Sequence, residues 1–231
     1  MQTVDKYARL EERSDITLIQ EVSRGNEYAY SEILSRYMEL VSRTSFRILC
    51  DRVDSESVTV QVFVSLWKNV FDYDDRFSLG EWLLRKVCSY CRIRIFRRRF
   101  FRLFGIENDV FVRASPVVDN EDDYLVKQAW ELFCRASVHM TPLQRAAYSL
   151  CVLEKIDKET AAKIIGFSSF RIGLAVQRAS EKVRSELRNF KKEGDYDRYV
   201  YFLKAVAESL TDHNKLMKEI RLQTGLDVNR E

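Results

Sequence analysis

The sequence contains few of the residues that interrupt helices. Only seven glycines and two prolines occur among 231 residues. β-Sandwiches, barrels and doubly wound sheets need frequent turns, which are rich in these two residues, so their scarcity argues against all three folds. The sequence instead predicts an all-α protein whose helices are joined by short connections. A chain of this length can bury two small hydrophobic cores.

Residues that bind metals or form disulfides are also scarce or poorly spaced. The only histidines are His139 and His213, and the cysteines number five, which is odd. Cys88 and Cys91 form a C-x-x-C, but no second pair completes the four ligands of a structural zinc site. Most cysteines fall within apolar helical stripes, which is typical of reduced core residues rather than of a disulfide framework.

The chain lacks the signatures of catalysis and of membrane insertion. No nucleophile–base pair, carboxylate dyad or phosphate-binding glycine loop is recognisable. We therefore predict that the protein is not an enzyme, binds no metal and needs no cofactor. The first 15 residues are polar, and no apolar run is long enough to cross a membrane, which predicts a cytoplasmic protein.

Positive charge is concentrated in one stretch, although the formal net charge is only +3. Residues 82–104, WLLRKVCSYCRIRIFRRRFFRLF, contain eight basic residues and no carboxylate. A helical apolar stripe runs along it: Leu84, Cys88, Cys91 and Ile95. Arginines repeat every seven residues beside that stripe: Arg85, Arg92 and Arg99. Ser78 and Glu81 form a capping box at the start of this helix.

Four phenylalanines are interleaved with these arginines: Phe96, Phe100, Phe101 and Phe104. Guanidinium groups suit phosphate oxygens and flat rings suit unpaired bases, so the stretch favours nucleic-acid binding. The alternative is an ordinary solvated basic helix.

Three helices are predicted before the basic helix. The first is capped by Asp15 and stops at Gly25, the second is capped by Asn26 and reaches Cys50, and the third covers about 54–70. Four helices of this length can close one core, so residues 1–104 are predicted to be the first domain.

The periodicity is lost over residues 105–122, which contain Pro116 and end in acidic residues. This stretch predicts a flexible acidic linker to a second helical domain at 123–192. A helix at about 123–139 opens that domain. Thr141, Pro142 and Gln144 then form a capping box that starts the next helix.

The second domain contains the pattern of a helix-turn-helix. Asp157 caps a short helix that Gly166 ends, and Ser168 or Ser169 starts a long one. The long helix has an apolar stripe: Ile172, Val176, Ala179, Val183 and Leu187. Helix pairs joined by glycine also occur without DNA binding.

A C-terminal extension at 193–231 is predicted to form one or two amphipathic helices. One apolar face contains Phe202, Leu203, Val206 and Leu210, and the other contains Leu216, Met217 and Ile220. We expect the extension to pack on the second domain, although it could also dock a partner.

The order of these parts resembles a bacterial RNA polymerase sigma factor of the extracytoplasmic-function type. Residues 15–99, which end in EWLLRKV and the basic run, look like the second conserved region of that family. Residues 140–187, which begin MTPLQRAAYSL, are similar to its fourth region. Each motif is weak alone, and their order and spacing carry the resemblance.

The resemblance implies a transcription initiation factor that directs core RNA polymerase to promoter DNA. Polymerase would bind the third helix at Glu56, Gln61, Phe63 and Trp67. The melted minus-ten element would be held by Tyr73, Arg76, Phe77, Trp82, Arg85, Lys86, Arg92, Arg94, Arg97, Arg98 and Arg99. The minus-thirty-five element would be bound by Ser169, Arg171, Gln177, Arg178 and Lys182. The acidic linker would lie in the nucleic-acid channel of the polymerase.

Two departures from the family pattern stand out. In the third helix the family has an acidic pair followed by Gln-Glu; Glu56 is kept here, but Ser57, Val60 and Gln61 occupy the other places. In the recognition helix, Gly173, Leu174 and Ala175 stand where donors to base edges are needed. We therefore expect weak minus-thirty-five reading, with the promoter address supplied partly by an activator or a DNA-targeting partner. The sequence does not decide whether an anti-sigma factor binds.

Two other interpretations remain open. A stand-alone helix-turn-helix regulator would explain the second domain but not the basic helix. A protein adaptor that has lost its DNA contacts would explain the altered recognition helix but not the eight basic residues.

Overall fold

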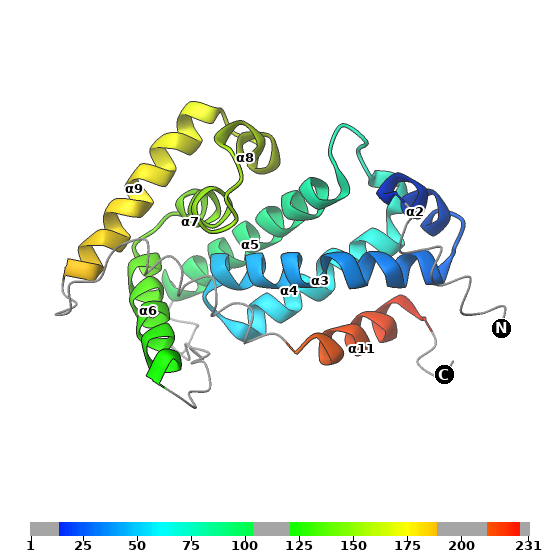
Figure 1. Cartoon of the computed structure of the whole chain (residues 1–231), viewed down its shortest axis with the longest axis horizontal. Helices are drawn as coiled ribbons and strands as arrows, with labels where there is room; N and C mark the ends of the chain where they lie inside the picture. Colours follow the sequence, from blue (N-terminus) through cyan, green and yellow to red (C-terminus); the bar gives the residue numbers. More distant parts are fainter. Residues whose placement is uncertain (1–13, 104–120, 189–211, 227–231) are drawn as a thin grey trace.

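The computed structural model describes residues 14–103, 121–188 and 212–226, and all regular structure in these ranges is helical (Figure 1). The first half contains α2 (Asp15–Val22), α3 (Glu27–Leu49), α4 (Arg52–Lys68), η1 (Val70–Asp72) and α5 (Leu79–Leu103). The second half contains α6 (Glu121–Val138), α7 (Pro142–Tyr148), η2 (Ser149–Leu153), α8 (Lys158–Ile165) and α9 (Ser169–Arg188). Helix α11 (His213–Thr224) follows. The predicted all-α class is confirmed.

Helices α3, α4 and α5 pack on one another around the core of the first half, and α2 packs against α3. Ile33, Phe63 and Leu83, one from each of the three long helices, are fully buried. The buried hydroxyl of Tyr30 donates a hydrogen bond to the Phe63 carbonyl at 2.8 Å. Because burial raises the pKa of Tyr30 well above its ordinary value, this donor stays protonated and holds α3 to α4.

Local capping signals place most of the helix ends where the sequence predicts them. Asn26 accepts from the Tyr28 and Ala29 amides, and Ser78 exchanges hydrogen bonds with Glu81 at the start of α5. Two starts differ. Ser14, not Asp15, caps α2, and α4 begins at Arg52 rather than near 54.

The α4 start was misplaced because its first turn is polar. Asp51 caps the helix by accepting from the Asp54 amide at 2.9 Å. The apolar periodicity that marks a helix in the sequence begins only at Val58. A capping residue can therefore start a helix about two turns before the apolar periodicity of that helix begins in the sequence.

The second half follows the predicted helix-turn-helix order. Thr141 and Gln144 form the predicted capping box at the start of α7. Asp157 caps α8 by accepting from the Thr160 amide at 2.8 Å. Gly166 ends α8 with φ +82°, a left-handed conformation that favours glycine. The chain can then turn directly into α9.

Replacing Thr141 with alanine is expected to destabilise the protein by about 1 kcal/mol, because the Gln144 amide loses its acceptor at the start of α7. Urea unfolding followed by circular dichroism measures the loss. Ser185→Ala, at an exposed position of α9, is the control and should change the stability little. Equal stabilities for the two variants would contradict the capping assignment.

The two halves pack against each other rather than only being joined by the linker. The Phe46 ring at the end of α3 stacks on Trp130 of α6, with ring centroids 4.5 Å apart. Helix α5 lies against α7 and α8. Glu154, just after η2, accepts from Arg43 at 2.9 and 3.0 Å and also pairs with the buried Arg47 of α3. Helix α6 begins at Glu121, so most of the predicted linker at 105–122 lies outside the described residues.

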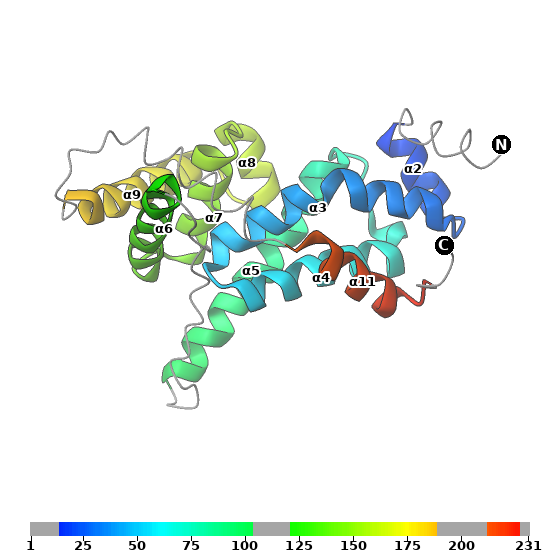
Figure 2. The ribbon, with the colours of Figure 1, turned by 60° about the horizontal axis from the view of Figure 1, so that its bottom comes forward.

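The described helix of the C-terminal extension, α11, does not pack where the sequence predicts. Helix α11 lies along α4 and α3 of the first half, not on the second domain (Figures 1 and 2). Its Leu216 and Ile220 are fully buried. The other predicted apolar face, at 202–210, lies outside the described residues, as do the side chains of Arg102, Phe104 and Leu187. Within the described ranges, no helix is long and apolar enough to span a membrane.

Candidate functional site

The outward side of α5 combines arginines with apolar side chains. We call this surface the exposed α5 face; it consists of Arg85, Lys86, Arg92, Ile93, Phe96, Arg97, Arg99 and Phe100. The predicted inward stripe, including Leu84, Cys88 and Cys91, is buried in the core. Phe96 and Phe100 leave more than half of their surface exposed. The sequence indicated these rings by their interleaving with the arginines, although they were not assigned as site residues.

Two of the predicted DNA-binding arginines have structural partners on α4. Arg94 donates to Asp54 at 3.0 Å and to Ser57 at 2.6 Å. Arg98 pairs with Asp51 at 2.9 Å and with Asp54 at 2.5 Å. Their charge is thus neutralised within the first half, and among the α5 side chains that the structure describes, the charge without a carboxylate partner is on the exposed α5 face.

The loop before α5 is built around a buried tryptophan. Trp82 is in the core and meets Tyr73 edge to face at 5.9 Å. The Tyr73 hydroxyl donates to the Phe77 carbonyl at 2.8 Å, and Lys86 lies over the Trp82 ring at 4.7 Å. In this arrangement Tyr73 and Trp82 shape the loop, and the buried Trp82 ring, which Lys86 covers, is not offered to a base.

The tip of this loop offers other side chains to solvent. Phe71, in η1 just before the loop, is 85% exposed. Arg76 is also exposed and forms an ion pair with Asp74 at 2.7 Å, which raises the pKa of Arg76 and lowers that of Asp74. Phe77 is half-buried beneath Arg85, whose guanidinium carbon is 5.2 Å from the ring centroid.

The second half covers part of the exposed α5 face. Arg85 donates to the Lys163 carbonyl of α8 at 2.9 Å, and Arg99 donates to the Met140 carbonyl at 2.7 Å. Between α5 and α7–α9 lies an open cavity of about 390 Å³, to which Arg92, Phe96 and Arg171 contribute. A ligand on this face would therefore meet both halves, or would have to displace one of them.

The helix-turn-helix residues are largely engaged within the protein. Ser169 bonds to Glu159 at 3.2 Å, and Arg171 stacks over Phe167 at 4.5 Å. The Gln177 amide donates to Glu181 at 3.1 Å. These three contacts use the polar atoms or the cationic face that DNA would need.

Two further cations complete the predicted DNA surface of α9. Lys182 donates to the His139 carbonyl at 2.5 Å and to the Gln144 side chain at 2.8 Å. Partial burial, then Arg178 and Arg99, lowers the pKa of Lys182. Arg178 itself is exposed. The exposed large apolar side chains of α9 are Phe170, at 81%, and Leu174, at 36%.

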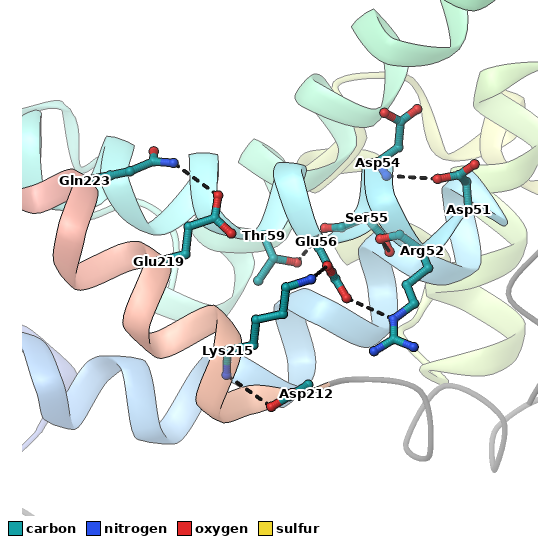
Figure 3. Close-up of polar contacts among 10 residues, drawn as sticks. All are labelled: Asp51, Arg52, Asp54, Ser55, Glu56, Thr59, Asp212, Lys215, Glu219 and Gln223. Carbon is teal, nitrogen blue, oxygen red and sulfur yellow. Dashed lines mark hydrogen bonds and ion pairs between the residues drawn. The ribbon is translucent and has the colours of Figure 1, made fainter. Parts of the chain in front are cut away.

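The four residues predicted to contact polymerase lie on different sides of α4. Glu56 is mostly buried and pairs with Arg52 at 2.9 Å and with Lys215 of α11 at 2.5 Å (Figure 3). Phe63 is fully buried, and the half-buried Trp67 packs on Tyr30 at 4.9 Å. Gln61 is exposed on the other side of the helix.

Cys88 and Cys91, the C-x-x-C pair of α5, are buried thiols. All five cysteines are free thiols, and burial raises the pKa of both Cys88 and Cys91. Among the described residues, no group of three or more histidine, cysteine or acidic side chains is placed to hold a metal ion. The C-x-x-C pair packs in the core.

Comparison with known proteins identifies similar structures but no similar sequences. No protein-family model matches the chain, and no curated protein matches it. CnrH, solved in complex with the cytosolic domain of CnrY, is 17% identical with a TM-score of 0.56, and the match covers 78% of this chain and 100% of CnrH. The sigma factor RpoE, solved with the anti-sigma factor NepR from Bartonella quintana, is 14% identical with a TM-score of 0.50. That match covers 69% of this chain and 96% of RpoE. The chain therefore has a sigma-factor-like fold.

Proposed function

We propose that this protein is a transcription initiation factor of the sigma type, which binds bacterial core RNA polymerase and holds the melted minus-ten strand on the exposed α5 face. The observation that carries the proposal is the composition of that face. It combines Arg85, Arg92, Arg97 and Arg99 with two exposed phenylalanines, and it contains no carboxylate. The sigma-factor-like fold supports the same function.

The chemistry required of this face is non-covalent. The arginines bind successive phosphates, and Phe96 and Phe100, together with Phe71 of η1, stack on unpaired bases at roughly 1–3 kcal/mol per base. Stacking is available only to a base that has left the duplex, so the face binds the opened strand more tightly than the closed one. Bond formation belongs to the polymerase.

Promoter binding requires the second half to release α5. Arg85 and Arg99 now donate to backbone carbonyls of the second half, and DNA phosphates would replace those acceptors. A phosphate is the stronger acceptor because its hydrogen bonds are charge-assisted. Replacing the carbonyl acceptors with phosphates therefore favours separation of the second half from α5 once DNA is present.

Upstream recognition by α9 is weak in this proposal. The Gln177 amide is held by Glu181, and the carboxylate of Glu181 repels phosphate. Gly173 offers no side chain, while Phe170 and Leu174 offer apolar surface. A protein partner, such as an activator or a DNA-targeting protein, fits these two side chains better than a base edge does.

We also propose an anti-sigma type of partner. RpoE was solved with the anti-sigma factor NepR, and CnrH with a domain of CnrY. In this chain the cavity between α5 and α7–α9 is lined by arginines and apolar side chains. A helix with acidic and aliphatic residues is complementary to both.

Size-exclusion co-elution with bacterial core RNA polymerase tests the proposed function. We expect a one-to-one complex that persists at about 0.5 M salt, because a contact held only by surface charge is screened there. An excess of another sigma factor should displace the chain from the polymerase. Without a complex, retained DNA binding would support a stand-alone regulator, and loss of both would support an adaptor.

A further inference from the structure

Helix α11 is a complete structural unit seated on α4. Asp212 caps its start by accepting from the Lys215 amide at 3.0 Å. Gly225 ends it with φ +75°, and the Leu226 amide donates back to the Arg221 carbonyl at 3.0 Å. Backbone groups at both ends of the helix are therefore hydrogen-bonded within α11 and its caps. The side chains of its inner face fix α11 to the rest of the chain.

The inner face of α11 combines aliphatic contacts with one ion pair. Leu216, Ile220 and Leu226 join the core of the first half. Lys215 reaches Glu56 at 2.5 Å, beside the intrahelical pair between Glu56 and Arg52 (Figure 3). Burial disfavours the Glu56 carboxylate, but the hydrogen bonds from Lys215 and Arg52 outweigh it and lower the pKa of Glu56. The carboxylate is therefore charged and paired.

The outward side of α11 carries polar side chains and one exposed leucine. Lys218 is exposed, and Leu222 is 74% exposed. Glu219 accepts from Gln223 along the helix at 3.2 Å (Figure 3). The helix is thus one-sided, and it offers α4 a cation and aliphatic groups in the same way that an amphipathic helix of another protein would.

From these contacts we infer that α11 is a built-in competitor, which occupies in cis the α4 surface around Glu56 that a helix of core RNA polymerase takes in the complex. The inference rests on the proposed function. The polymerase helix must offer a basic residue to Glu56 and aliphatic side chains beside it. Polymerase and α11 then exclude each other, and anything that removes α11 from α4 activates the protein.

Substitutions on the two sides of α11 test this competition in the full chain. The double variant Lys215→Glu with Ile220→Asp removes the cation and the aliphatic contact that hold α11. The matched control, Lys218→Glu with Leu222→Asp, makes the same change of charge on the exposed side. Binding to core RNA polymerase is measured by fluorescence anisotropy of a labelled chain.

We expect the inner variant to bind polymerase about tenfold more tightly, which corresponds to α4 being uncovered in roughly a tenth of unmodified molecules. The control should bind like the unmodified protein. Equal affinities for both variants would overturn the competition while leaving the proposed function intact. Failure of every variant to bind would overturn the proposed function and the inference together.

Amide hydrogen exchange gives an independent test that needs no substitution. In the unmodified protein, polymerase binding should speed exchange at 213–224 and slow it in α4. If α11 stays protected in the complex, it does not compete, whatever the variants do. This measurement also decides the case if the inner variant fails to fold.

Discussion

Replacing Glu154 with glutamine is expected to lower the apparent free energy of unfolding by about 3–5 kcal/mol. The Glu154 side chain is 8% exposed and holds two arginines of α3, of which Arg47 is only 2% exposed. Removing one partner of a buried ion pair leaves a desolvated charge without its counter-ion, and this penalty exceeds the net value of the pair itself. Urea unfolding followed by circular dichroism measures the change.

Glu39→Gln is the matched control. Glu39 also pairs with Arg43, at 2.5 Å, but its side chain is 53% exposed. Exposed pairs contribute little, so we expect a loss of less than about 1 kcal/mol. Similar small losses for both variants would mean that Glu154 is hydrated in solution and that the two halves separate readily.

Helix positions were predictable because their signals are local. The capping box of Thr141 and Gln144, the Asn26 cap and the Gly166 stop each involve residues within four positions of one another. Such contacts form whatever the rest of the chain does. The same reasoning predicted the buried stripe of α5 from its helical spacing.

The partners of the charged residues were not predictable, because they come from distant parts of the chain. Arg94 and Arg98 were assigned to DNA with the other arginines of α5, yet they pair with carboxylates more than 35 residues earlier. Glu154 follows a π-helical turn, which the hydrophobic periodicity of the sequence did not predict. The spacing of its apolar residues predicts that one face of α11 packs against another helix, but it does not identify that helix.

These long-range contacts narrow the choice of residues that can report on DNA binding. Replacing Arg98 with glutamate would break its ion pairs with Asp51 and Asp54. A loss of activity in that variant could come from lower stability as well as from weaker DNA binding. Arg85 and Arg99 donate hydrogen bonds to carbonyls of the second half, so replacing them would also alter the contact between the halves. Arg92 and Arg97 are both exposed on α5, and they give the cleanest test of the proposed minus-ten contact.

We expect the double variant Arg92→Glu with Arg97→Glu to weaken binding of the polymerase complex to a forked, partly single-stranded promoter by roughly 100-fold. Two charge-assisted hydrogen bonds to phosphate, each contributing about 1.5 kcal/mol or more, account for this change. The salt dependence should fall as well. Each lost contact to single-stranded DNA removes about 0.7 from the slope of log K against log salt, so two contacts remove about 1.4.

The control is Arg24→Glu with Lys155→Glu, which changes the net charge equally at exposed positions outside α5. It should leave both the affinity and the salt slope nearly unchanged. Affinity for core polymerase should be the same in both variants, because neither alters α4. If the α5 variant binds the forked DNA normally, the exposed α5 face is not the strand-binding surface, even if the chain binds polymerase. Equal losses in the two variants would mean that net charge, rather than this face, drives the binding.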